Sequence, residues 1–179
     1  MGDRLFGLNA GFAYALFIQS CHFHYLQSYN AINDRIPMPI PQIVLDTNII
    51  VSGLRSRKAS AFRLLELVGT GEFDIHLSVP LVLEYREVLL RELPNLYVSA
   101  TDIEDFIEFH CSVATRHRIF FLWRPYLPDP KDDMVLELAV TARCDSVVTY
   151  NIRDFFGIER FGIRAIAPAE FLRDIGALL

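Results

Sequence analysis

The stretch Gln42-Ile43-Val44-Leu45-Asp46-Thr47-Asn48 decides the fold that this sequence predicts. Its continuous apolar run from Ile43 to Leu45 is typical of a strand buried on both faces inside a parallel sheet. Open parallel sheets bind their ligands at the carboxyl ends of the strands. Asp46 directly follows this strand, so the sequence places a carboxylate where a ligand is expected.

Strand and helix patterns alternate along the chain from residue 41 onward. The predicted strands are 42–46, 73–77, 119–122, 146–149 and 163–166. The predicted helices are 59–69, 80–93, 101–117, 132–142 and 168–175. Strands that alternate with helices predict an α/β fold with a central parallel sheet of about five strands, flanked by helices. We therefore expect one α/β domain over residues 41–179.

Residues 1–40 differ from this domain and are expected to form an appendage to it. They hold an apolar, aromatic patch from Phe6 to Phe17 and end in a proline-rich run. The start Met1-Gly2-Asp3-Arg4 and the interruption at Asn9 make a poor secretory signal. We interpret the segment as a disordered extension or a loose helix, with a membrane-surface role as the lesser alternative.

Charge and cysteine content restrict the functional class. The formal charge of -5 argues against coating of nucleic acid by a basic surface, although a nuclease with metal-binding carboxylates would itself be acidic. The three cysteines are odd in number and form no CxxC pair, which favours a reducing, cytoplasmic compartment. No apolar run is long enough to span a bilayer, so stable membrane insertion is not expected.

Three more groups of polar or acidic residues follow Asp46 along the chain. Glu84 shares the apolar stripe of helix 80–93, where a carboxylate is costly unless something compensates it, although an ion pair would suffice. Asp132 is in helical phase with the apolar face of helix 132–142, whereas Asp133 points elsewhere and, with Asp129, fits a helix-start cap. Asn151 and Asp154 follow strand 146–149, where a simple turn would use the same residue types.

Together with Asp46, these three groups of polar or acidic residues predict a metal site. Carboxylates that converge on one cleft repel one another, and a cation relieves that repulsion. Oxygen ligands without His or Cys select Mg²⁺ or Mn²⁺ over zinc. Such ions suit phosphodiester hydrolysis, and neither a nucleophilic Ser or Cys signature nor a Walker-type phosphate loop is present to suggest another reaction.

Four segments, taken as a set, resemble the PIN-domain family. They are Val44–Ser52, the helix around Glu84, Asp129–Ala139 and Val147–Asn151. The resemblance covers roughly residues 42–174 and is strongest to the prokaryotic, VapC-like PIN proteins that are toxin components of toxin–antitoxin systems. It implies a Rossmann-like sheet and a metal-dependent endoribonuclease. It also implies an RNA substrate, an antitoxin partner and, as in many family members, a homodimer.

Residue roles follow from the same resemblance. Asp46, Glu84 and Asp132 would be the catalytic metal ligands. Asn48 and Thr149 would support them by orienting Asp46 or the attacking water. The family often has Asp where this chain has Asn151, a weaker metal partner, which puts a second ion and full activity in doubt. Asp154, three residues on, would either replace that carboxylate or only hydrogen-bond nearby.

Several other residues in the sequence allow two interpretations. Arg55, Arg57 and Lys58 follow the Asp46 turn and would either form a solvated helix start or hold RNA phosphates. Trp123 and Tyr126 would cover the core or stack on a base. Cys21-His22-Phe23-His24 has metal-binding residue types but no second ligand pair at a recognised spacing. His76, His110 and His117 are interpreted as packing or surface residues, the last two on a helix.

Two alternatives to the nuclease remain at this point. One is a catalytically weakened PIN-like module that binds RNA or a protein. The other is a phosphoacceptor receiver domain, which is also α/β with an acidic pocket but needs a Lys after a late strand, and no convincing one is present.

Overall fold

The computed structural model describes residues 39–122 and 124–178, and these contain a five-stranded, wholly parallel sheet. The strands are β1 (Gln42–Leu45), β2 (Asp74–Ser78), β3 (Thr115–His117), β4 (Ser146–Val148) and β5 (Arg164–Ile166). The α-helices are α2 (Thr47–Arg55), α3 (Ser60–Glu66), α4 (Val79–Glu92), α5 (Ala100–Val113), α6 (Asp133–Ala142) and α7 (Pro168–Asp174). Short 3-10 turns are η1 (Leu93–Asn95), η2 (Ile152–Phe155) and η3 (Ile158–Phe161). The predicted α/β class is confirmed.

The strand order β3-β2-β1-β4-β5 positions the site. From the central strand β1 the chain builds two strands on one side and later two on the other, so β1 and β4 flank the point where the strand order reverses. Asp46 N donates to Val148 O at 3.0 Å, which extends this pairing past the end of β1. Ligands of open α/β sheets bind at such a crevice.

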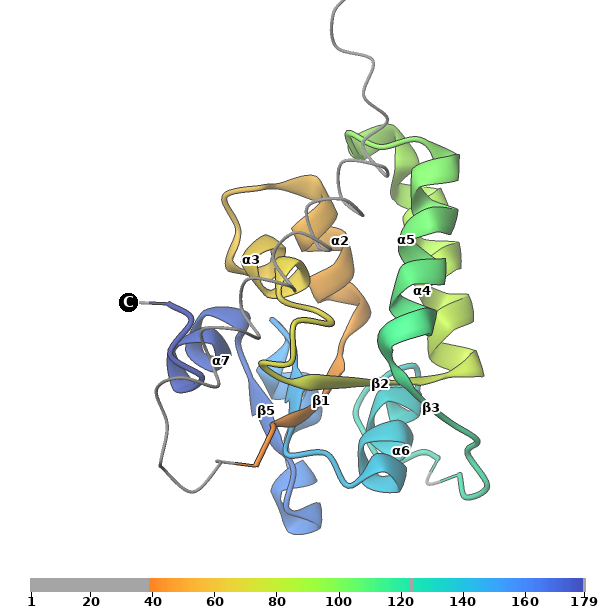
Figure 1. The fold of residues 1–179 in the computed structure, drawn as a ribbon. Coiled ribbons are helices and arrows are strands. Elements are labelled where there is room, and N and C mark those ends of the chain that lie inside the picture. The colour runs from red at the N-terminus through yellow and green to blue at the C-terminus, as the bar shows by residue number, and fades with distance from the viewer. Residues whose placement is uncertain (1–38, 123, 179) are drawn as a thin grey trace, which may run out of the picture. The chain divides into compact units, whose positions relative to one another are not determined.

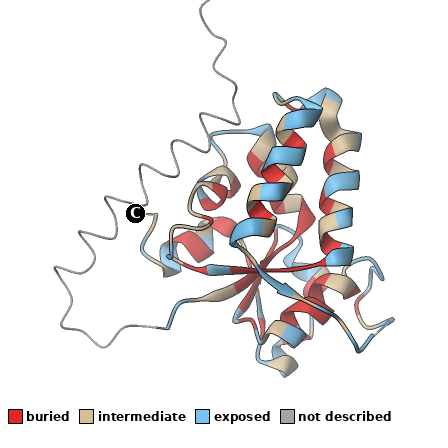
Figure 2. Cartoon of the chain, turned by 45° about the vertical axis from the view of Figure 1, so that its right-hand side comes forward, coloured by how far each residue is buried: buried red, intermediate tan, exposed pale blue. Residues whose placement is uncertain are grey.

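Helices cover the sheet on both faces. Helix α6 contacts β1, β2, β3 and β4 from one side, while α2 and α3 lie on the other (Figure 1). Helices α4 and α5 pack against one another, as do α3 and α7. Figure 2 shows the buried residues concentrated in the strands and on the inward faces of the helices. The three apolar residues Ile43, Val44 and Leu45 are at most 2% exposed, as expected for the middle strand.

The third strand is a correction to the sequence prediction. The sequence predicts strand 119–122, but β3 is the polar segment Thr115–His117, and helix α5 ends at Val113 rather than near residue 117. The apolar run that suggests the strand is exposed, with Phe120 and Phe121 each at 79%. Because β3 is an edge strand with little burial, its pairing with β2 leaves no apolar pattern in the sequence.

Helix α2 is absent from the sequence prediction. Its residues include the β-branched Ile49, Ile50 and Val51 and a glycine, which have low intrinsic helix propensity. Burial of Ile49 and Ile50 stabilises the helix instead. A Cβ at Gly53 would lie 2.4 Å from Leu65 Cδ1, so glycine is what permits α2 to approach α3 closely.

The predictions for residues 1–40, and with them the Cys21-His22-Phe23-His24 motif, fall almost wholly outside the described residues, as does Trp123. The boundary of the domain near residue 41 stays a prediction. Within the part of the chain that is described, none of the helices has the length and apolarity to cross a membrane.

Candidate metal and nucleic-acid site

Asp46 is held rigidly at the carboxyl end of β1. Its Oδ2 accepts hydrogen bonds from Asn48 Nδ2 at 2.7 Å and from Thr149 Oγ1 at 2.6 Å. Asn48 is itself fixed, because its Oδ1 accepts from Tyr150 N at 3.2 Å. Burial raises the pKa of Asp46, while the hydrogen bond from Thr149 opposes that rise. The supporting positions expected of Asn48 and Thr149 are therefore present around the Asp46 carboxylate.

Glu84 reaches the same region from helix α4. Its Oε1 accepts a hydrogen bond from Thr47 Oγ1 at 3.1 Å, whereas its Oε2 is buried with no hydrogen-bond partner. Burial raises the pKa of Glu84, and the charge on Asp46 adds to the rise. Thr47, the first residue of α2, has no role assigned from the sequence. A buried carboxylate oxygen without a donor is costly, and a bound cation would satisfy it.

The loop before α6 supplies the third group of carboxylates. Asp132 is half-buried, and burial followed by the charges of Asp46 and Asp129 raises its pKa to about 7. Asp129 Oδ1 accepts from Lys131 N at 2.9 Å, which stabilises the turn, and its side chain lines the same cavity. The interpretation of Asp129 as a mere helix cap is therefore incomplete, because its carboxylate also faces the site.

Asp133 has a different role from its neighbour and from the predicted one. It is fully buried, and its Oδ1 accepts from Leu127 N at 2.8 Å and from Tyr126 N at 3.2 Å. It thus holds the loop before α6 and does not cap the helix. The predicted difference in direction between Asp132 and Asp133 holds, since only Asp132 lines the cavity.

The segment that follows β4 contributes less to the site than the end of β1, helix α4 and the loop before α6. Asn151 is exposed just after β4 and lines the cavity. Asp154 lies in η2 and does not line it, although its charge raises the pKa of both Asp46 and Asp132. Asp154 therefore acts on the site through its charge, while the fourth lining position is the neutral Asn151.

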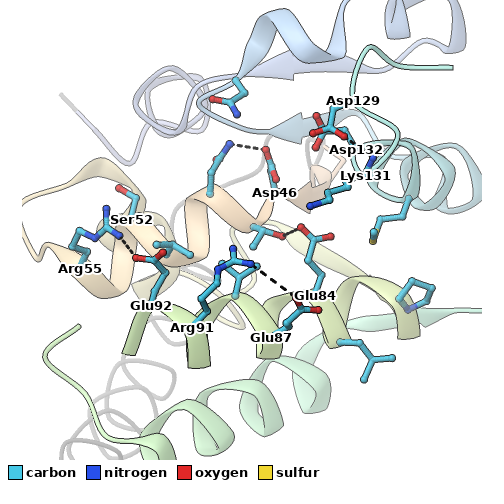
Figure 3. Close-up of a pocket in the computed structure, with 18 of the residues that line it drawn as sticks. Asp46, Ser52, Arg55, Glu84, Glu87, Arg91, Glu92, Asp129, Lys131 and Asp132 are labelled. Carbon is cyan, nitrogen blue, oxygen red and sulfur yellow. Dashed lines mark hydrogen bonds and ion pairs between the residues drawn. The ribbon is translucent and has the colours of Figure 1, made fainter. Parts of the chain in front are cut away.

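Asp46, Glu84, Asp129, Asp132 and Asn151 line one open cavity of about 700 Å³ between α2, α4 and the loop before α6 (Figure 3). The lining includes six carboxylates, from Asp46, Glu84, Glu87, Glu92, Asp129 and Asp132. It includes three basic side chains, from Arg55, Arg91 and Lys131. Arg57 and Lys58, predicted with Arg55 as phosphate ligands, are exposed and do not line the cavity. Arg91 and Glu92 have no site role assigned from the sequence.

The four carboxylates at the sheet end of the cavity are poorly compensated. Glu87 and Glu92 are paired with the two arginines, which leaves Lys131 as the basic side chain in the lining facing Asp46, Glu84, Asp129 and Asp132. Lys131 lowers the pKa of Glu84 but not enough to offset its burial. This excess of negative charge suits a hard divalent cation with oxygen ligands.

The carboxylates share a cavity without forming a ready-made cage. Among residues 39–122 and 124–178, no three Asp, Glu, His or Cys side chains lie close enough together to coordinate one ion. Mg²⁺ commonly keeps several waters and uses one or two carboxylates, and the orphan Glu84 Oε2 and the Asp46–Asp132 repulsion fit that mode. The donor set therefore matches such an ion.

A family model described as the PIN domain matches residues 42–153, which include every site residue except Asp154. The chain belongs to the PIN-domain family. PIN domains are generally nucleases. The prediction from the sequence motifs is thus confirmed at the level of the family and its fold.

Among solved structures, one match is the crystal structure of VapBC2 from Rickettsia felis bound to a DNA fragment from their promoter. It is 15% identical and covers 69% of this chain and 98% of that chain, with a TM-score of 0.49. No curated protein matches the sequence.

The histidines and Tyr126, which the sequence left as packing, surface or base-stacking residues, pack within the described part of the chain. His76 is buried and bonds to His117 Nε2 and Gln42 Oε1, both at 2.8 Å, and His117 lies on β3 rather than on a helix. His110 is buried against Phe106. Tyr126 packs on Phe161 and does not line the cavity. None of these side chains contributes to the lining.

Proposed function

We propose that this PIN domain is a metal-dependent endoribonuclease that hydrolyses RNA phosphodiester bonds. The observation that supports it best is the sheet end of the cavity, where four carboxylates face one lysine and Glu84 Oε2 has no hydrogen-bond partner. Repulsion among these groups is relieved by a divalent cation, and phosphodiester hydrolysis is a reaction that such a cation assists.

In this proposal Mg²⁺ or Mn²⁺ binds among Asp46, Glu84 and Asp132, with one or two of these carboxylates as direct ligands and the others reached through bound water. When bound, the ion supplies charge stabilisation at the phosphate and a more acidic water. The protein's own contribution is orientation. Asn48 and Thr149 fix the Asp46 carboxylate by hydrogen bonds of 2.7 and 2.6 Å.

The remaining positions complete the site. Thr47 donates a hydrogen bond to one oxygen of Glu84, and the other oxygen, which has no hydrogen-bond partner, would contact the ion or its water. The exposed Asn151 amide offers a hydrogen bond to the substrate or to the attacking water, and Asp154 adds negative charge near Asp46. Arg57 and Lys58, outside the cavity, are proposed to contact RNA phosphates farther along the strand.

We extend the proposal to the toxin component of a cytoplasmic toxin–antitoxin system. This step rests on the sequence motifs from Val44 to Asn151, which resemble those of VapC-like toxins. An antitoxin would then be the protein partner, and a homodimer the assembly. A non-catalytic RNA- or protein-binding module is the alternative, and the neutral Asn151 in place of a carboxylate favours it.

Cleavage of a 5′-labelled RNA by the purified full chain tests the proposal. We expect cleavage with MnCl₂ or MgCl₂, none with EDTA, and loss of at least ~100-fold in Asp46→Asn. Asp105→Asn, an exposed carboxylate on α5, is the matched control and should cleave normally. Cleavage that survives Asp46→Asn would refute the site. RNA binding without cleavage in any divalent ion would favour the module.

A further inference from the structure

Helices α2 and α4 carry two ion pairs in the cavity lining that the proposed chemistry does not use. Arg55 Nη2 lies 2.7 Å from Glu92 Oε2, which links the end of α2 to the end of α4. Arg91 Nη1 lies 3.9 Å from Glu87 Oε1, one turn along α4. Both arginine side chains are more than half exposed. Pairs exposed to this degree contribute little to stability, so stability gives no reason for gathering them here.

These pairs and the metal-binding carboxylates share one cavity. Figure 3 shows Arg55 and Glu92 at one end of it and Asp129 with Asp132 at the other, while Arg91 and Glu87 lie between them beside Glu84. An RNA strand with a phosphate at the sheet end would continue along the cavity and bring a neighbouring phosphate to the arginines. A cavity with six carboxylates repels a polyanion unless cationic groups of this kind are available.

We propose that Arg55 and Arg91 hold a phosphate of single-stranded RNA next to the cleaved bond, and that Glu92 takes that phosphate's place in the free protein. The inference rests on the proposed ribonuclease function. Guanidinium groups bind carboxylate and phosphate oxygens with the same planar geometry. The Glu92 carboxylate, 2.7 Å from Arg55, therefore marks the position of a phosphate oxygen.

Displacement of Glu92 by RNA leaves its carboxylate with another donor. Asn95 Nδ2, in the turn η1, lies 3.3 Å from the same Oε2. Glu92 can therefore swing out of the phosphate position while keeping a hydrogen bond. In this arrangement Glu92 competes with RNA for Arg55 and lowers the affinity for it.

The test compares two variants that break the same ion pair. Binding of a fluorescein-labelled single-stranded RNA is measured by anisotropy in CaCl₂ over a range of KCl concentrations. Arg55→Ala should bind roughly 3- to 10-fold more weakly, with the slope of log K against log salt reduced by about 0.7. Glu92→Gln should bind tighter by a similar factor. Arg91→Ala should behave like Arg55→Ala.

A second ion pair supplies the matched control. Arg86 Nη2 and Glu104 Oε1 are also 2.7 Å apart and similarly exposed, but they join α4 to α5 outside the cavity. Arg86→Ala and Glu104→Gln change the net charge by the same amounts and should leave RNA affinity within about twofold. Circular dichroism melts of all five variants check that each one is folded.

The outcomes separate this inference from the proposed function. Opposite shifts in Arg55→Ala and Glu92→Gln support it, because loss of a purely structural pair would move both variants in the same direction. Equal affinities, shifts of the same sign, or no RNA binding by the wild type overturn it. If the protein cleaves RNA in MnCl₂ but Arg55→Ala binds RNA as tightly as the wild type, the phosphate position is refuted and the nuclease proposal stands. If Arg55→Ala weakens RNA binding but the protein does not cleave RNA, the nuclease proposal is refuted and the phosphate position stands.

Discussion

Thr149 Oγ1 donates a 2.6 Å hydrogen bond to Asp46 Oδ2, which joins the ends of β4 and β1 across 103 residues of sequence. The same hydroxyl accepts from Asn151 N at 2.9 Å and from Asn48 Nδ2 at 3.1 Å. One buried side chain thus fixes three of the residues that surround the proposed metal position. Outer residues of this kind set the orientation of metal ligands.

Replacement of this hydroxyl should impair both activity and metal binding. Thr149→Val keeps the shape but removes the donor to Asp46, so we expect cleavage to fall by ~10- to 100-fold. The midpoint for Mn²⁺ activation should rise. Thr149→Ser keeps the oxygen and should retain most of the activity. Equal losses in the Val and Ser variants would show that packing of the methyl group, and not the hydrogen bond, matters.

Asp132 and Asp133 are adjacent, yet their removal should have opposite effects on stability. Burial and nearby carboxylates raise the pKa of Asp132 from 3.8 to about 7, so the native state loses stability progressively between these pH values and the loss is complete above pH 7. Asp132→Asn should therefore raise the free energy of unfolding at pH 8, by roughly 1 kcal/mol once solvent screening of this half-exposed group is discounted. Asp133→Asn weakens the acceptor for Leu127 N and Tyr126 N. This substitution should lower the free energy of unfolding by about 1–3 kcal/mol.

Denaturant unfolding and RNA cleavage measure the two variants. Asp132→Asn should be stable and inactive, whereas Asp133→Asn should be less stable but active at temperatures where it remains folded. A stable, inactive Asp133→Asn together with an active Asp132→Asn would exchange the assigned roles.

The orphan oxygen of Glu84 predicts a stabilisation by metal. Saturating MnCl₂ should raise the free energy of unfolding, by about 3 kcal/mol at a hundredfold excess over Kd, and EDTA should reverse the effect. Glu84→Gln should lose most of this gain. Glu87→Gln, on the same helix but 78% exposed and paired with Arg91, should keep it. Thermal melts with and without MnCl₂ measure the shift, and an unchanged shift in Glu84→Gln would remove Glu84 from the ligands.

His110 predicts a loss of stability in mild acid. Burial lowers its pKa to about 4, and its Nδ1 lies 2.8 Å from Phe106 O. Because the unfolded chain binds a proton near pH 6.5 and the native state only near pH 4, the stability contributed by the neutral His110 is fully present above pH 6.5. It is lost progressively as pH falls through that window, by about 3 kcal/mol in total.

Urea unfolding between pH 7.5 and pH 4 measures this slope. His110→Leu cannot titrate and should show a shallower decline over the same range, whatever its stability at pH 7.5. The same slope in both proteins would assign the acid sensitivity to other groups.

Helical phase in the amino-acid sequence agrees with where two of the proposed site residues lie. It places Glu84 on the inward stripe of the predicted helix 80–93 and Asp132 on the inward face of the predicted helix 132–142, and both line the cavity. The interpretation of Asp133 as a helix cap is wrong, because its side chain is fully buried and accepts a hydrogen bond from Leu127 N. Phase gives the direction of a side chain from its own helix axis. It does not show what an adjoining loop places over that side chain.

Weakly patterned segments are the other source of error. The edge strand β3 is polar, and α2 is rich in β-branched residues, so neither shows its structure in the sequence. The misplaced strand at 119–122 follows from an apolar run that is exposed. Burial decides these elements, and burial depends on neighbours distant in the chain.

The sequence by itself determined the α/β fold, the carboxylate at the end of the central strand and the family, because period and local residue order encode them. Only the tertiary structure decided which side chains meet. The pairing of Glu84 with Thr47, the cavity position of Asp129 and the bridge from Arg55 to Glu92 each join segments through space. Such contacts depend on how the helices cross over the sheet, and no local pattern of residues records that geometry.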